Sequence, residues 1–278
     1  MGALDGFRIV TLAVNVPGPV AVARLRRLGA SVTKVEPPEG DLLALSSPDW
    51  YRDLVEGQHV VRLDLKDAGG RSELDRMLEE ADLLLTAQRP AALARLGLTW
   101  RDLHERFPRL VQVAVVGHPQ PDQDRPGHDL TYLAKRGLLT PPELPRTLMV
   151  DLGGAERAVT AALELLLARE RGAGGTYVEV ALAEAADVLA EPLRRGLTAS
   201  GGLLGGGLPG YGLYETRNGW VAVAALEPRF QQRLAEELGL PELTRASLEE
   251  AFRSRTAVEW EAWALERDLP IEAVGSRE

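Results

Sequence analysis

The sequence predicts an α/β protein in which a large domain with a mostly parallel sheet precedes a smaller α+β domain. Up to about residue 150, short apolar segments alternate with amphipathic helical segments, the order of a parallel sheet covered on both faces. The stretch "SGGLLGGGLPGYG" then has the low complexity of a linker or loop. After it, "YGLYETRNGWVAVAAL" has two alternating runs around Asn218-Gly219, which indicate a β-hairpin.

The first βαβ unit is expected within the opening residues. Residues 7–13, "FRIVTLA", favour a buried strand, and a Gly-Pro turn follows. Residues 21–29 have helical spacing, and residues 31–36 favour a second strand. Strand, turn, helix and strand within about 30 residues match the size of a βαβ unit. Because the turn reads "PGP" and not G-x-G-x-x-G, it does not indicate a dinucleotide site.

The same alternation continues along the chain. Further strands are expected at residues 59–65, 82–86, 110–117 and 176–182. Helices are expected at residues 70–81, 90–98, 100–107, 130–137, 151–172, 183–196, 228–238, 247–253 and 256–266. The segment between the second and third strands shows no pattern and is expected to be irregular. We therefore predict a Rossmann-like large domain over residues 1–200 and a small α+β domain over residues 201–278.

Composition narrows the possible functions. A net charge of −9 argues against a general nucleic-acid binder, although a basic pocket for a small anion remains compatible with it. The chain has no cysteine, which excludes disulfides, thiolate metal sites and a cysteine nucleophile, and no metal-binding motif stands out. Without a signal-peptide pattern or a membrane-spanning apolar segment, a cytoplasmic protein is expected.

His128 is the first candidate site residue. It stands in "RPGHDLTYLAKRG" and is one of only four histidines. A side chain that titrates near neutral pH suits proton transfer. The ordinary alternative is a structural or solvated histidine at a helix start, where Asp129 could simply cap the following helix.

Three further residues stand where a site could form. Asp151 opens the long helix, either as its cap or as a carboxylate beside free helix N–H groups. Glu227 lies between a strand and a helix, where a cap is equally reasonable. Arg89 follows the strand "DLLLT", and an arginine at the carboxyl end of a parallel strand could bind phosphate or form a surface ion pair.

Five ordered blocks of the chain resemble the family III CoA-transferase superfamily, and within it the α-methylacyl-CoA racemases. The resemblance covers about residues 1–275, and five blocks together are more specific than any one of them. The blocks begin "LDGFRIVTLAVNVPGPV", "LDLKDAGGRSELDRM", "GHDLTYLAKRG", "DLGGAERAVTAALEL" and "YETRNGWVAVAALEPRF".

The resemblance implies roles for the candidate residues. Transferase members generally lack the "GHD" histidine and use the aspartate that matches Asp151 as a nucleophile. Racemase members pair that histidine with the same aspartate, so the presence of both His128 and Asp151 favours the racemase pattern. The resemblance further implies that Glu227 interacts with His128 and that Arg89 lies near CoA, although Ala91 replaces the usual glycine.

The expected activity is therefore an acyl-CoA racemase or epimerase acting on the 2-methyl (α-carbon) centre of an acyl-CoA thioester. Two acid/base groups on opposite faces would remove and return the proton through an enolate. We expect backbone N–H groups near the start of the Asp151 helix to stabilise the enolate oxygen. No metal or redox cofactor is required, since CoA is part of the substrate. Two alternatives remain: a CoA transferase with Asp151 as nucleophile, and a non-catalytic acyl-CoA-binding homologue.

The sequence departs from the family pattern in three places. The family's chain normally continues for several tens of residues past the segment matching "DLPIEAV", so the return to the large CoA-binding domain is expected to be missing. The stretch "EGQHVVR" replaces a basic "R-G-K-R", and Asn15 is expected near the site. Because the family forms interlocked homodimers, we expect a homodimer, with an acyl-CoA substrate and with neither nucleic acid nor a membrane as a partner.

Overall fold

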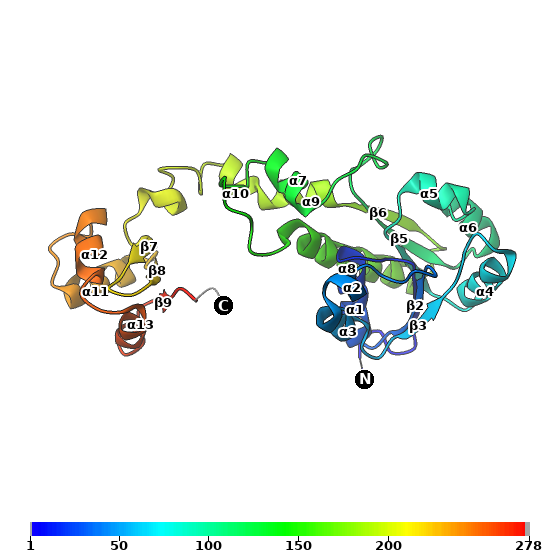
Figure 1. Cartoon of the computed structure of the whole chain (residues 1–278), viewed down its shortest axis with the longest axis horizontal. Helices are drawn as coiled ribbons and strands as arrows, with labels where there is room; N and C mark the ends of the chain where they lie inside the picture. Colours follow the sequence, from blue (N-terminus) through cyan, green and yellow to red (C-terminus); the bar gives the residue numbers. More distant parts are fainter. Residues whose placement is uncertain (1, 276–278) are drawn as a thin grey trace. The chain divides into compact units, whose positions relative to one another are not determined.

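The computed structural model describes residues 2–275. The chain divides into two compact units, Met1–Ala190 and Glu191–Glu278 (Figure 1). The sequence-based boundary, between residues 200 and 201, lies a short way beyond this division. No helix within residues 2–275 combines the length and the apolar character needed to cross a lipid bilayer.

A six-stranded, all-parallel sheet forms the centre of the first unit. Its strand order is β3-β2-β1-β4-β5-β6, which confirms the predicted Rossmann-like fold. The order reverses between β1 and β4, and ligands of such sheets bind at this switch point. The strands are β1 (Arg8–Thr11), β2 (Ser31–Glu36), β3 (His59–Arg62), β4 (Leu83–Thr86), β5 (Val111–Val116) and β6 (Tyr177–Ala181).

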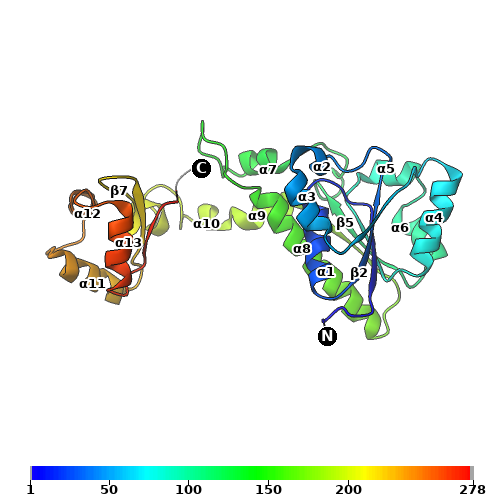
Figure 2. The ribbon, with the colours of Figure 1, turned by 60° about the horizontal axis from the view of Figure 1, so that its bottom comes forward.

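Helices cover both faces of this sheet (Figures 1 and 2). One face packs against α1, α7, α8 and α9, and the other against α4, α5 and α6. Strand β5 reads "VQVAVV" and is buried at every residue, because both of its sides meet a helical layer. The helices are α1 (Pro17–Arg27), α4 (Ala68–Glu79), α5 (Pro90–Arg95), α6 (Trp100–Arg106), α7 (Asp129–Lys135), α8 (Met149–Glu170) and α9 (Leu182–Leu189).

Three helical segments differ from the expectation. The stretch expected to be irregular contains α2 (Leu43–Ser46) and α3 (Pro48–Val55). Helix α1 begins at Pro17, earlier than predicted, because proline is compatible with the first helical turn. The single helix predicted for residues 183–196 is divided into α9 and α10 (Glu191–Arg194). Pro192 explains the division, since it has no N–H for the helical hydrogen bond.

The second unit is built on a three-stranded antiparallel sheet of order β7-β8-β9. The hairpin around Asn218-Gly219 is confirmed, whereas the short strand β9 was not expected. The glycine-rich stretch folds on itself, and the Leu204 N–H donates to the Leu197 carbonyl at 2.9 Å. The elements are the irregular turn η1 (Leu203–Gly207), β7 (Tyr211–Glu215), β8 (Trp220–Ala224), α11 (Pro228–Leu238), α12 (Arg245–Phe252), α13 (Ala257–Leu265) and β9 (Ile271–Ala273).

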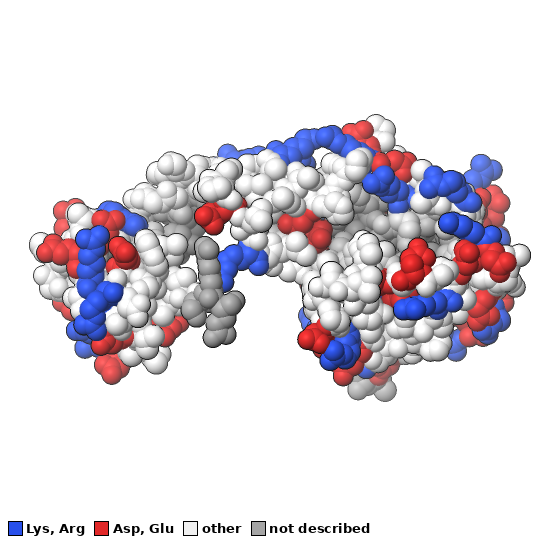
Figure 3. All heavy atoms as spheres, in the orientation of Figure 1, with Lys and Arg blue, Asp and Glu red and all other residues white. Residues whose placement is uncertain are grey.

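A buried ionic group secures the turn that follows β1. Acidic and basic side chains are mixed over the visible face of each unit (Figure 3), where ion pairs contribute little to stability. The Lys34 side chain, by contrast, is only 1% exposed. Its Nζ lies 2.5 Å from the Asp41 Oδ2 and 3.1 Å from the Glu36 Oε1. The Asp41 carboxylate also accepts the Asn15 N–H at 3.0 Å. This hydrogen bond holds Asn15 in a left-handed conformation, with a φ of 70°, beside the carboxyl edge of the sheet.

The start of α1 provides a test of core packing. An added Cβ at Gly18 would lie 2.2 Å from the Ala13 Cβ, so Gly18→Ala should lower the free energy of unfolding by about 1–3 kcal/mol. Gly153, in α8, has no atom within 4 Å of such a Cβ. Gly153→Ala should therefore raise stability by about 0.5–1 kcal/mol, because alanine favours the helix. Urea unfolding followed by circular dichroism measures both, and an equal effect of the two substitutions would contradict this packing.

Candidate active site

A cavity of about 230 Å³ lies at the carboxyl ends of β1, β4 and β5, next to the switch point of the sheet. Three of the predicted site residues, Arg89, His128 and Asp151, line this cavity together. Asn15 also lines it, as expected. The structure thus brings together side chains from three separate parts of the first unit.

Asp129 joins the two helices that carry His128 and Asp151. Its side chain is buried, and its Oδ1 accepts the N–H groups of Val150 at 2.7 Å and Asp151 at 3.0 Å. A carboxylate from the first residue of α7 therefore caps the start of α8, where the helix dipole favours a negative charge. The simple alternative, in which Asp129 caps its own helix, is wrong.

The backbone of His128 is held by the first turn of α7. Its N–H donates to the Thr131 Oγ1 at 3.0 Å, and the Thr131 hydroxyl donates to the His128 carbonyl at 2.8 Å. His128 itself is exposed and contributes to the cavity wall. Because the next residue is Asp129, the position of His128 is coupled to the start of α8.

Burial raises the pKa of the Asp151 carboxyl to about 6. The charge of Asp129 raises this pKa further, and the nearby His128 acts in the opposite direction. A carboxyl group with such a pKa exchanges protons readily near neutral pH, which is what a general acid/base requires.

Two of the helix N–H groups expected to stabilise an enolate oxygen are already engaged. The N–H groups of Val150 and Asp151 donate to Asp129, and that of Leu152 donates to the Leu148 carbonyl at 3.0 Å. The expectation of oxyanion donors at these positions is therefore wrong, because the capping carboxylate occupies them.

Tyr132 is a cavity residue that the sequence reasoning did not select. Its ring is buried and meets the His118 ring edge-on, with centroids 5.3 Å apart. An added Cβ at Gly117 would lie 2.6 Å from the Tyr132 hydroxyl, and one at Gly127 would lie 2.5 Å from it. Two glycines thus make room for this hydroxyl. The available signal was the stretch "GHDLTY", in which Tyr132 completes the "GHD-x-x-Y" pattern of the racemases that the sequence resembles.

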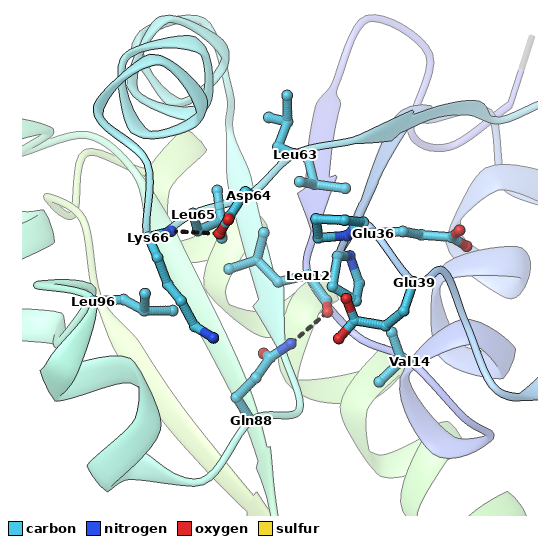
Figure 4. Close-up of a pocket in the computed structure, with 13 residues that line it drawn as sticks. Leu12, Val14, Glu36, Glu39, Leu63, Asp64, Leu65, Lys66, Gln88 and Leu96 are labelled. Atoms are coloured by element: carbon cyan, nitrogen blue, oxygen red, sulfur yellow. Dashed lines mark hydrogen bonds between the residues drawn. The ribbon is translucent and has the colours of Figure 1, made fainter.

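A second cleft, of about 350 Å³, lies at the carboxyl ends of β1, β2 and β3 (Figure 4). Lys66, Gln88 and Glu39 point toward its interior, and the Gln88 amide is held by the Leu12 carbonyl at 2.5 Å. Val14 lines both this cleft and the smaller cavity. The two spaces therefore share the turn after β1 as a common wall.

Glu227 belongs to the second unit. It is exposed and occupies the residue before α11, whose first residue is Pro228. Its orienting role toward His128 stays a prediction. Within residues 2–275, no cluster of three or more histidine, aspartate or glutamate side chains has the arrangement of a metal site.

Comparison with known proteins places the chain among CoA-dependent enzymes. The sequence model of CoA-transferase family III matches residues 4–278. "Probable fatty acyl-CoA transferase Rv3272" of Mycobacterium tuberculosis is 28% identical over 92% of this chain and 78% of its own length. "Alpha-methylacyl-CoA racemase" of Homo sapiens is 29% identical over 93% of this chain and 74% of its own. The crystal structure of Rv3272 superposes with a TM-score of 0.86 and 28% identity, covering 99% and 85% of the two chains.

The raised pKa of Asp151 predicts a pH-dependent effect on stability. Between about pH 4 and 6 the folded state holds a proton on Asp151 that the unfolded state has lost, so stability decreases as the pH rises through this range. Asp151→Asn removes the unfavourable free energy of ionising a buried carboxyl group. It should raise the free energy of unfolding by about 1–3 kcal/mol more at pH ~8 than at pH ~4.

Urea denaturation at the two pH values measures this difference. Asp53 is exposed on α3 and provides the matched control. Asp53→Asn should change the free energy of unfolding by less than about 0.5 kcal/mol at either pH. An Asp151→Asn effect that is the same at both pH values would contradict the burial of an ionised carboxylate.

Proposed function

Because the chain belongs to CoA-transferase family III, we propose that it is an acyl-CoA racemase or epimerase that inverts the carbon next to the thioester carbonyl. The observation that carries this proposal is that His128 and Asp151 line one cavity, on helix starts that Asp129 joins. A relative named as an α-methylacyl-CoA racemase supports the same reading.

The proposed reaction needs only proton transfer. One member of the pair takes the α-proton, the C–H electron pair forms a carbon–carbon double bond, and the carbonyl electrons move to the thioester oxygen. The other member then gives a proton to the opposite face of the carbon, and the enolate returns to a thioester. The pair holds one proton in each resting state and two while the enolate is present, and no atom changes its oxidation state, so the step requires neither a metal nor a redox cofactor.

The pKa of about 6 suits Asp151 to this role. An ordinary aspartate would be a weaker base, whereas a carboxylate with a raised pKa gains more from accepting the α-proton. Glu227 is proposed to orient the His128 imidazole within a homodimer, the assembly that the family resemblance implies.

The two adjoining spaces suit the two ends of an acyl-CoA. The thioester and α-carbon would lie in the cavity with His128 and Asp151, and the nucleotide part in the larger cleft with Lys66 (Figure 4). Arg89, at the start of α5, would meet phosphate groups of CoA. This arrangement follows the rule that ligands bind at the switch point of a parallel sheet.

CoA transfer is the second candidate, because the M. tuberculosis relative is named a probable fatty acyl-CoA transferase. In that reaction an Asp151 oxygen attacks the thioester carbonyl and releases the CoA thiolate, which leaves an acyl anhydride on the protein. The cavity position of Asp151 is compatible with this attack.

The two-base reaction predicts complementary defects in two variants. Wild type should interconvert (2R)- and (2S)-2-methylbutanoyl-CoA and should exchange the α-proton of both with D2O. Asp151→Asn and His128→Gln should each lower inversion by about 10²- to 10⁴-fold. Each variant should still exchange the α-proton of one stereoisomer, and the favoured stereoisomer should be opposite for the two variants, because one base remains.

Proton NMR in D2O with chiral analysis of the product measures both processes, and Asp53→Asn should match wild type. Absence of exchange with wild type would contradict the racemase proposal. Loss of exchange for both stereoisomers in both variants would contradict the proposal that His128 and Asp151 each act as the base for one stereoisomer.

CoA transfer predicts a covalent intermediate instead. Incubation with an acyl-CoA and hydroxylamine should then convert Asp151 to its hydroxamate, seen by mass spectrometry as a modified peptide that Asp151→Asn lacks. The racemase proposal predicts no such modification. Binding of acyl-CoA without exchange or modification would leave a non-catalytic acyl-CoA-binding protein.

A further inference from the structure

The proposed reaction places negative charge on the thioester oxygen, and a hydrogen-bond donor must face that oxygen. A single donor of this kind contributes about 10²- to 10³-fold to rate in related chemistry. The N–H groups of Val150 and Asp151, at the start of α8, are already bound to Asp129. The donor must therefore come from elsewhere on the cavity wall.

Tyr132 has the features of such a donor. It lines the same cavity as His128 and Asp151, and its ring is only 2% exposed, so its orientation is set by packing. Among the described residues 2–275, its hydroxyl has no hydrogen-bond partner, and the hydroxyl oxygen is not one of the fully buried unpartnered polar atoms, as expected for a group that faces the cavity. The hydroxyl is thus available to a group that enters the cavity.

The glycines around Tyr132 define where this hydroxyl lies. Gly117 follows β5 and Gly127 precedes His128, and both line the cavity. A Cβ on either would lie within 2.6 Å of the hydroxyl oxygen or the ring, closer than van der Waals contact allows. The hydroxyl therefore reaches the cavity wall through a gap that only glycine leaves open.

We propose that the Tyr132 hydroxyl donates a hydrogen bond to the thioester oxygen of the bound acyl-CoA, and that this bond strengthens as the enolate forms. The inference rests on the proposed acyl-CoA substrate and adds a catalytic donor to the His128 and Asp151 pair.

The surroundings of Tyr132 keep it a donor and not a proton-transfer group. Burial raises the pKa of its hydroxyl, and the nearby Asp151 raises it further, while Arg89 acts in the opposite direction. Tyr132 therefore keeps its proton through the reaction. Protons leave and reach the α-carbon only through His128 and Asp151, and the enolate oxygen accepts a hydrogen bond without gaining a proton.

Two ligands that differ only in the carbonyl oxygen isolate this contact. 2-Methylpropanoyl-CoA carries the thioester, and S-(2-methylpropyl)-CoA is the thioether in which a methylene group replaces the carbonyl. Tyr132→Phe retains the ring and should weaken binding of the thioester about 3- to 10-fold, with the thioether unchanged. Gly117→Ala should have the same selective effect, because its Cβ displaces the hydroxyl. Isothermal titration calorimetry measures the four dissociation constants against wild type.

Tyr214→Phe is the matched control. Tyr214 is also a buried tyrosine, in the second unit, but its hydroxyl donates to the Pro209 carbonyl. This variant should leave both dissociation constants unchanged. For catalysis, Tyr132→Phe should slow deuterium exchange of 2-methylpropanoyl-CoA about 10²- to 10³-fold at saturating substrate.

The binding comparison separates this inference from the racemase proposal. Suppose that wild type binds the thioester more tightly than the thioether but exchanges no proton, and that Tyr132→Phe binds the two ligands equally. The Tyr132 contact then stands and the racemase proposal fails. If exchange occurs and Tyr132→Phe retains both wild-type exchange and wild-type selectivity, the inference is overturned and the racemase proposal stands. An equal loss of both ligands would also overturn it, because that result indicates a structural role.

Discussion

The two hydrogen bonds from the start of α8 to the Asp129 carboxylate are the interaction on which the candidate site depends. They bring together two helix starts and join Asp129 to Asp151, 22 residues further along the chain. Without this carboxylate, the buried N–H of Val150 and the partly buried N–H of Asp151 would lose their partner, and the loss at the buried group alone costs about 1–3 kcal/mol. Burial is the main reason for the raised pKa of Asp151, and the charge of Asp129 raises it further, so one side chain both joins the two helix starts and affects the protonation of Asp151.

A second buried polar group supports the part of the cavity wall that Asn15 forms. Lys34, Glu36 and Asp41 are buried together. The Asp41 carboxylate connects them to the turn after β1 by accepting a hydrogen bond from the Asn15 N–H. Removing such charges from water is costly, and only close pairing offsets the cost. The result is a fixed turn that separates the small cavity from the larger cleft. The site is thus bounded by two buried aspartates that take no part in the proposed proton transfer.

The elements that depend on local pattern could be predicted from the sequence. Strand β5 is apolar at nearly every residue, and the Asn218-Gly219 hairpin has the strongest short-range signal in the chain. Strand β9 has only three residues and is defined by its pairing with β8, so its local sequence pattern does not predict it. Helix α3 was missed because "PDWYRDLV" is short and buries only Leu54 fully.

The candidate site was likewise predictable only where local sequence carried the signal. His128 and Asp151 could be selected because their chemistry and order match a family pattern. The roles of Asp129 and Tyr132 depend on how α7 packs against α8 and β5, and neither residue type reveals this by itself. In the sequence, Asp129 has the position of an ordinary cap for its own helix. Only the three-dimensional structure shows that its carboxylate caps α8 instead.

The link through Asp129 makes the site independent of the peptide chain that connects its two halves. The segment between α7 and α8 runs over the surface, and residues 140–144 are exposed. Because the helix starts are joined by hydrogen bonds, their register does not depend on the length or composition of this loop. The loop is therefore free to vary in sequence, to accept insertions or to carry a recognition element of its own, while the starts of α7 and α8, with His128 and Asp151, stay in place.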